Sequence, residues 1–222
     1  MVVALWSFRL EESLPPERRS VIHPGAVLRA IGHALRNTTF LRYTTLTTIL
    51  FTGISTYVAS SEHIISDLYG QPTLFAIIFG AIGLTMALGA LSNAAISARF
   101  GTRRAIKGLL IIYVVVAMVL LAGSLLFRPQ PPLPFFFTCI GLLMGANLAI
   151  EPNSSALAME PMGDMAGIAA SLYGTCFFFV GASLGSIISA LLAHSVMPMV
   201  IGFAGIGLIA LSLVLTDRHK AL

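Results

Sequence analysis

Six long, nearly uncharged apolar stretches fill most of this 222-residue chain. They cover residues 40–61, 73–98, 105–127, 135–158, 166–193 and 199–216. With a rise of about 1.5 Å per residue, each stretch is long enough to cross a hydrocarbon layer of about 30 Å as one helix. A helix on the surface of a water-soluble protein has polar residues along one face, and these stretches have no such face. The sequence therefore predicts an all-α membrane protein, a bundle of six transmembrane helices.

The basic residues are distributed unevenly between the two sets of connections. If residues 1–39 lie on the cytoplasmic side, the outer loops contain a single basic residue, Arg128. The inner segments and their flanks then contain Arg9, Arg18, Arg19, Arg29, Arg36, Arg42, Arg99, Arg103, Arg104, Lys107, Arg218 and Lys220. Because positively charged loops stay in the cytoplasm, we predict that both termini are cytoplasmic. The expected location is a bacterial-type inner (plasma) membrane.

The composition excludes the usual interpretation of a basic chain. Charged residues make up 10% of the sequence, against about 25% in a typical soluble protein. An isoelectric point of about 9.4 in a soluble protein would suggest nucleic-acid binding. Here the cations lie at the ends of apolar stretches, where they orient helices and meet lipid headgroups. We expect the lipid bilayer as a partner and no nucleic acid.

Residues 1–39 precede the first stretch. Residues 1–8 are apolar but too short to span a membrane, and they resemble the end of a preceding helix, while residues 9–19 form a charged linker broken by prolines. After Pro24 the sequence predicts a helix whose two faces differ, with Val27, Leu28, Ile31 and Leu35 opposite Arg29, His33 and Arg36. This pattern suits a helix in the membrane interface, and a plain linker helix fits it equally well. Residues 217–222 are predicted to be a cytoplasmic tail.

The connections between the stretches are short. The inner connection 99–104 and the proline-rich outer connection 128–134 leave little room between consecutive helices, which we therefore expect to be antiparallel neighbours. Three stretches precede the proline-rich segment and three follow it. This hydropathy pattern permits two three-helix repeats, a common plan in transporters.

Glu151 is the only acidic residue deep inside a predicted span. An ionised carboxylate at mid-membrane costs about 2.5–3.5 kcal/mol or more. Asn147, Glu151 and Ser155 recur every four residues, so they lie on one helix face, and Pro152 should bend the helix beside the carboxylate. We interpret Glu151 as a protonatable group in a wet cavity that couples proton binding to transport. The alternatives are a protonated, hydrogen-bonded glutamate between helices or a position nearer the inner interface.

Several other residues are candidates for a substrate path or for helix packing. Hydroxyl groups recur in the first span at Thr48, Thr52 and Ser55, and with Asn153, Tyr173 and Phe177 they complete the set of substrate-path candidates. Such hydroxyls more often donate back to their own helix, and aromatic side chains in a span more often pack against lipid or the core. Two small-residue motifs, Gly141 with Gly145 and Gly181 with Gly185, predict close helix packing.

No catalytic or metal-binding motif is present. The sequence lacks HExxH, GxSxG and P-loop patterns, and no Asp lies inside a predicted span. The five histidines are scattered with no pair at metal-ligand spacing, and Cys139 and Cys176 lie in predicted spans as small apolar residues. We therefore expect no enzyme activity, no cofactor and no metal.

Residues 152–170 carry the most specific pattern. Pro152, Asn153, Ala156-Leu157-Ala158, Glu160-Pro161, Gly163 and Ala166-Gly167 match a P-N-x-x-A-L-A-x-E-P-x-G-x-x-A-G pattern. This segment resembles the connection between the tenth and eleventh helices of major facilitator superfamily transporters of the bicyclomycin/chloramphenicol-resistance type, which are drug:proton antiporters. Arg9 to Leu14 resembles the segment after the sixth helix of that family. Arg99, Gly101, Arg103 and Arg104 resemble its basic inner-loop motif.

The resemblance covers essentially the whole chain and implies that its six spans are helices seven to twelve. The fold would then be one half of a major-facilitator fold. The function would be transmembrane transport, the export of a hydrophobic or amphipathic drug-like molecule in exchange for protons. A second six-helix half, or self-association of this chain, would be needed. The alternative is a non-transporting truncated remnant, or a membrane scaffold that associates with another transporter.

Two positions depart from the family pattern. Ala98 stands where the fuller inner-loop motif has an acidic residue, so Arg99, Arg103 and Arg104 are interpreted as anchors of topology. Relatives of this type usually have an apolar residue at the position of Glu151, which makes this carboxylate a feature of the present chain.

Overall fold

The computed structural model describes residues 24–127 and 130–217. The predicted segments 1–8 and 9–19, and the tail beyond Asp217, lie outside these residues. Every regular element in the described part of the chain is a helix, and that part contains no strand. Its elements in order are α2 (Pro24–Ala34), α3 (Thr38–His63), η2 (Ile64–Leu68), η3 (Pro72–Leu74), α4 (Phe75–Phe100), α5 (Thr102–Leu126), α6 (Leu133–Met159), η4 (Glu160–Met165), α7 (Ala166–Thr175), η5 (Cys176–Val180), α8 (Gly181–Ala190) and α9 (Met197–Leu215).

Each predicted span corresponds to one long helical segment whose ends lie within three residues of the expected ones. The fifth span is the continuous segment α7–η5–α8. Five segments of the described chain are long and apolar enough to cross a membrane, beginning at Pro72, Thr102, Leu133, Ala166 and Met197. The first expected span, α3, is not among them. Its 26 residues include so many Thr and Ser that its apolar content falls below that of the other five.

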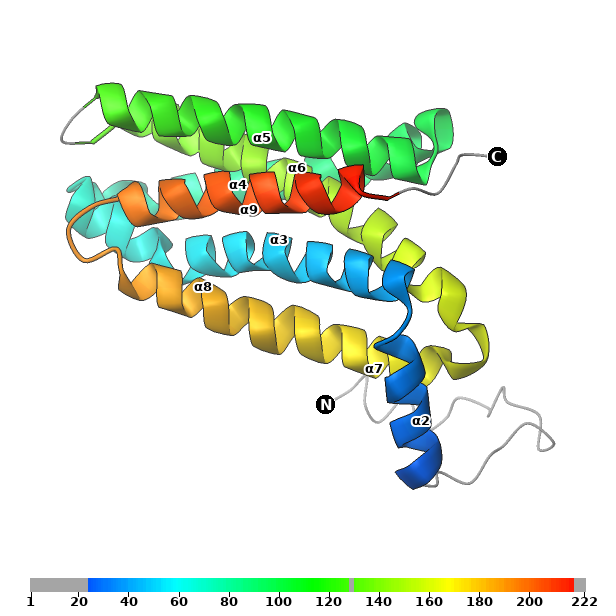
Figure 1. Ribbon diagram of the computed structural model, residues 1–222. Coiled ribbons are helices and arrows are strands. Elements are labelled where there is room, and N and C mark those ends of the chain that lie inside the picture. The colour runs from blue at the N-terminus through cyan, green and yellow to red at the C-terminus, as the bar shows by residue number, and fades with distance from the viewer. Residues whose placement is uncertain (1–23, 128–129, 218–222) are drawn as a thin grey trace, which may run out of the picture.

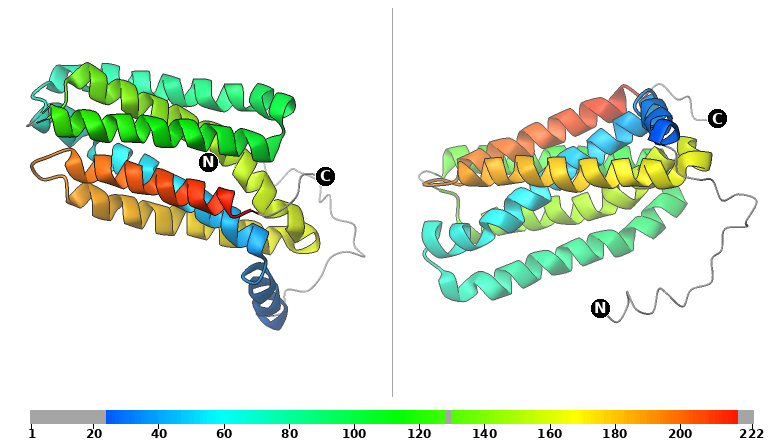
Figure 2. Two further views of the ribbon diagram at one scale, coloured as in Figure 1. Left: turned by 45° about the horizontal axis from the view of Figure 1, so that its top comes forward. Right: turned by 90° about the horizontal axis from the view of Figure 1, so that it is seen from below.

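The long helices run side by side in an elongated bundle (Figure 1). Helix α6 is its centre, because it packs against α3, α4 and α5, while α8 and α9 pack against α3. In the right view of Figure 2, α4 and α9 lie along opposite edges of the bundle. Most residues in the apolar part of α6 are buried. In the apolar parts of α4 and of α7–α8, only 6% and 11% of the residues are buried. The described structure is therefore an all-α bundle in which α4 and the α7–α8 segment are broadly open.

Glycines set the closest helix crossings. A Cβ atom on Gly89 of α4 would lie 2.0 Å from the carbonyl oxygen of Gly145 on α6, so the two backbones touch there. Gly185 of α8 similarly leaves no room for a side chain against Ser55 of α3. Both predicted motifs lie at crossings, with Gly141 against Thr85 of α4 and Gly181 against Phe51 of α3.

A single glycine makes the turn between α4 and α5. Gly101 has φ +79°, a backbone conformation that other residues rarely adopt, and it joins Phe100 directly to Thr102. Arg99, Arg103 and Arg104 are thereby held at one end of the bundle. We call this end, where Arg42 also lies, the basic end.

Helix α2 leaves the bundle at the basic end (Figure 1). Val27 and Ile31, from the predicted apolar face, line a groove with Ile168 of α7, while Leu28 on the same predicted face is exposed. The predicted apolar face is therefore divided between the bundle and its surroundings, and both the interfacial helix and the plain linker helix stay predictions.

Candidate functional site

Glu151 meets Tyr173 where α6 passes α7. The Tyr173 hydroxyl donates a hydrogen bond to Glu151 Oε1 at 3.2 Å, and both residues are half-buried. The α-helix continues through Pro152, and the turns that follow it run away from α5 in Figure 1. Because Pro152 has no amide hydrogen, the Leu148 carbonyl lacks its helical donor one turn from the carboxylate. This is the only acid–hydroxyl pair between the predicted spans in the described chain.

Aromatic rings surround the Tyr173 side of this pair. Phe177 stacks on Tyr173 with ring centroids 5.9 Å apart and an interplanar angle of 10°. Phe51 of α3 lies 4.4 Å from Phe177 and 5.3 Å from Phe178, which closes the cluster from the next helix. The site thus combines one carboxylate with an apolar aromatic wall.

A π-helical segment positions this wall. Residues Cys176–Val180 form a π turn between α7 and α8, which places one more residue in the turn than an α-helix does. Phe177 and Phe178 both belong to this segment, and their rings meet edge to face at 4.9 Å. Both of these successive aromatic side chains contact the same partner, Phe51.

The predicted polar stripe on α6 is divided. Asn147 is fully buried and donates from Nδ2 to the Leu50 carbonyl of α3 at 2.8 Å, so it joins two helices instead of lining an open path. Glu151 and Ser155 are half-buried. The Ser155 hydroxyl donates to the Pro152 carbonyl in its own helix. Of the three residues in the stripe, only Glu151 and Ser155 are therefore partly exposed.

The hydroxyl groups of α3 are used inside the protein. Thr48 donates to the Thr44 carbonyl at 2.8 Å and Thr52 to the Thr48 carbonyl at 3.1 Å, and both are buried. Ser55 donates across to the Ala182 carbonyl of α8 at 3.4 Å. The hydroxyl groups of Thr48, Thr52 and Ser55 therefore bond to backbone carbonyls of α3 and α8, and none of them bonds to Glu151.

Asn153 lies in a second polar cluster, on the α4 side of α6. The Ser97 hydroxyl is 2.9 Å from Asn153 Oδ1 and 3.1 Å from Asn93 Oδ1, and Asn153 Nδ2 donates to Asn93. Asn153 is two residues beyond Glu151, so it faces another helix. This cluster joins α4 to α6 near the basic end.

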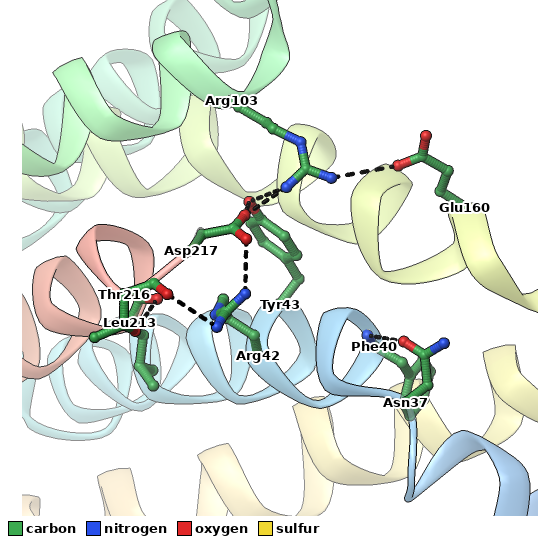
Figure 3. Close-up of polar contacts among 9 residues, drawn as sticks. All are labelled: Asn37, Phe40, Arg42, Tyr43, Arg103, Glu160, Leu213, Thr216 and Asp217. Atoms are coloured by element: carbon green, nitrogen blue, oxygen red, sulfur yellow. Dashed lines mark hydrogen bonds and ion pairs between the residues drawn. The ribbon is translucent and has the colours of Figure 1, made fainter. Parts of the chain in front are cut away.

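A charged network holds the basic end together (Figure 3). Asp217, which follows α9 and is 8% exposed, accepts hydrogen bonds from Arg42 at 2.8 Å, from the Tyr43 hydroxyl at 2.9 Å and from Arg103. Arg103 also lies 3.7 Å from Glu160, and its guanidinium is 5.7 Å from the centre of the Tyr43 ring. Three helices, α3, α5 and α9, therefore meet at one carboxylate.

Sequence reasoning missed the roles of three residues, Asp217 and Arg103 in the charged network and Phe51 beside Tyr173. Asp217 was assigned to a tail, although it joins Arg42, which is 175 residues away. Arg103 does more than anchor topology, whereas Arg99 and Arg104 stay outside the network. Phe51 was overlooked because one aromatic residue in an apolar span carries no pattern of its own.

Five segments long and apolar enough to cross a membrane, packed into one bundle, define a multi-pass membrane protein. The sequence profile described as Major Facilitator Superfamily matches residues 1–186. The chain belongs to this superfamily of transporters.

Two relatives agree with this assignment. An uncharacterised MFS-type transporter of Bacillus subtilis (strain 168), YdgK, is 32% identical over 196 residues, 86% of this chain and 46% of the relative. A bicyclomycin resistance protein homolog of Haemophilus influenzae is 26% identical over 202 residues, 90% of this chain and 50% of the relative. The chain thus spans about half the length of the curated relatives it matches. No solved structure matches it at a significant level.

Proposed function

We propose that the chain acts as the C-terminal half of a proton-coupled efflux transporter for hydrophobic or amphipathic small molecules. The observation that carries the proposal is the Glu151–Tyr173 pair, a half-buried carboxylate among aromatic rings inside the apolar length of α6. Transport across the membrane is the activity common to the superfamily, and proton coupling and drug export are the specific steps proposed for this chain.

Glu151 is suited to proton coupling because its charge is costly in this surrounding. An ionised carboxylate at mid-membrane costs about 2.5–3.5 kcal/mol or more, and protonation removes that cost. The Tyr173 hydroxyl donates a hydrogen bond to this carboxylate and so joins α7 to α6 at Glu151. Movement of α7 relative to α6 would break this contact, so the proposed coupling links proton binding at Glu151 to the position of α7.

The aromatic wall supports an apolar or amphipathic substrate. Phe51, Tyr173 and Phe177 offer flat apolar surfaces next to one carboxylate, a combination typical of sites for drug-like molecules. The relative from Haemophilus influenzae is named as a bicyclomycin resistance protein homolog, which supports a drug as the substrate class.

A second six-helix half completes the proposed transporter. The site lies beside α7, and α4 and α7–α8 leave most of their apolar surface uncovered within this half. Additional sequence, a separate polypeptide or a second copy of this chain would supply the facing half and enclose the substrate. In the proposed orientation the basic end is cytoplasmic, the membrane is a bacterial inner membrane, and both ends of the chain lie inside.

Transport assays of Glu151 variants test the proposal. The chain is produced together with a six-helix N-terminal half, and drug accumulation in cells and drug-induced proton movement in vesicles are measured. We expect Glu151→Gln to abolish proton-driven export while membrane insertion persists. Tyr173→Phe keeps the ring stack and should weaken export less, because only the hydroxyl is removed.

Glu160→Gln is the matched control, because Glu160 is an exposed acid outside the apolar span. Its export should remain near that of the unmodified protein. Proton-driven export that persists in Glu151→Gln would contradict the role of this carboxylate. Equal drug accumulation with and without the chain, when its presence in the membrane is verified, would favour the non-transporting alternative.

A further inference from the structure

A groove separates α4 from α5 at the basic end. It has a volume of about 350 Å³. Its walls are apolar apart from one arginine, and the lining residues are Ile96, Phe100, Arg104, Ala105, Gly108, Leu109 and Ile112. Phe100 and Ile112 are each more than half exposed, so the groove is open along its length to the surroundings of the bundle. It lies between α4 and α5, whereas the Glu151 site lies between α6 and α7.

Positive charge gathers at one end of this groove. Arg104 lines it, and the Arg99 guanidinium lies 5.4 Å from the centre of the Phe100 ring, which forms the same wall. Within residues 24–127 and 130–217, no carboxylate forms an ion pair with either arginine, in contrast to Arg42 and Arg103, which share Asp217. The first turn of α5 also begins here with no side-chain cap, so its free amides add to the positive potential.

The dimensions of the groove match one leaflet of a bilayer. Arg104 and Ile112 are eight residues apart on α5, which corresponds to about 12 Å along the helix. Half of a hydrocarbon layer of about 30 Å is about 15 Å. Gly108 leaves the middle of the groove open, because a Cβ atom there would meet no atom within 4 Å. One acyl chain can therefore lie against the apolar wall while its headgroup reaches the arginines.

We propose that this groove is a binding site for one anionic phospholipid. The phosphate lies between Arg104 and Arg99, and one acyl chain follows Ile96, Leu109 and Ile112 toward the membrane centre. The choice of an anionic lipid rests on charge complementarity, because the two arginines lack carboxylate partners in the described chain. A zwitterionic lipid would fill the same groove but leave the positive charge uncompensated.

Lipid titration of the full chain in detergent micelles tests the site. Bound lipid is counted by native mass spectrometry during titration with phosphatidylglycerol, with phosphatidylcholine of the same acyl chains and with inorganic phosphate. We expect phosphatidylglycerol to bind with one tight site, phosphatidylcholine to bind more weakly, and inorganic phosphate not to displace the lipid. Displacement by phosphate alone, or equal binding of the two lipids, would overturn the proposal.

Variants place the site in the groove. Arg104→Gln should weaken phosphatidylglycerol about fivefold, which corresponds to about 1 kcal/mol for one basic residue at the membrane surface. Gly108→Leu fills the groove and should weaken both lipids. Lys107→Gln is the matched control, because Lys107 is an exposed cation on the same helix that does not line the groove. An equal loss in Lys107→Gln and Arg104→Gln would show general surface attraction and refute the site, even if Gly108→Leu fails to fold.

Discussion

Replacement of Asp217 by Ala should destabilise the bundle more than removal of any exposed acid. The carboxylate is 8% exposed and joins Arg42, Tyr43 and Arg103. Without it, two guanidinium groups stay close together and the buried Tyr43 hydroxyl loses its acceptor. Loss of one partner from a fully buried ion pair costs about 3–5 kcal/mol. Because Arg42 and Arg103 are 20% and 35% exposed, water compensates part of the loss, and we expect about 2–3 kcal/mol.

Two further variants separate charge from hydrogen bonding. Asp217→Asn keeps one acceptor oxygen but loses the charge, so its loss of stability should be intermediate, about 1–2 kcal/mol. Glu160→Gln removes an acid that is 65% exposed and 3.7 Å from Arg103, and its effect should be below about 0.5 kcal/mol.

The assay is reversible unfolding in mixed micelles, followed by the helical circular dichroism signal. The expected order of stability is unmodified protein, Glu160→Gln, Asp217→Asn and Asp217→Ala. Equal stability of Asp217→Ala and Glu160→Gln would refute the inference that one carboxylate joins α3, α5 and α9.

Two other predictions concern a helix crossing and a pH-dependent contact. Gly89→Ala should separate α4 from α6 and lower the melting temperature by several degrees, because its Cβ would overlap the Gly145 carbonyl. Gly83→Ala on the same helix is the control, because its Cβ would meet no atom within 4 Å and should have little effect. Equal melting temperatures of the two variants would contradict the close crossing. His63, beyond the predicted span 40–61, contacts Asp67 at 2.7 Å and the Leu192 carbonyl at 3.0 Å, and the hydrogen bond to Asp67 raises the pKa of His63 above its usual value. Its contribution to stability is therefore complete below about pH 6.5 and is lost as the pH rises through the raised pKa. The difference in melting temperature between the unmodified protein and His63→Gln should shrink from pH 5.5 to pH 8.5, and a difference that grows with pH would contradict the contact.

Local patterns predicted the helices, and the structure places the two glycine motifs beside neighbouring helices. An apolar run long enough to span lipid has few alternatives to a helix, because every backbone amide in the membrane needs a partner. Gly141 and Gly185 were recognisable for a similar reason, since spacing of four places small residues on one face. These features depend on residues near each other in the chain.

Contacts between distant segments were not predictable in this way. Periodicity placed Asn147 and Glu151 on one face, but only the packed structure shows that α3 covers Asn147 and leaves Glu151 accessible beside Tyr173. Asp217 joins a residue 175 positions away, and the π segment at Cys176–Val180 has no spacing pattern in the sequence. A single chain without aligned relatives carries no signal for such pairs.

The scarcity of apolar residues in α3 has a consequence for biosynthesis. This helix lies inside the bundle and is less able than the others to enter lipid by itself. Its partners α6, α8 and α9 are all translated later, so the contacts that bury the Thr and Ser residues of α3 within this bundle form only after α3 has been synthesised. The packing of α3 therefore waits for helices that are made after it, and the order of synthesis differs from the order of packing.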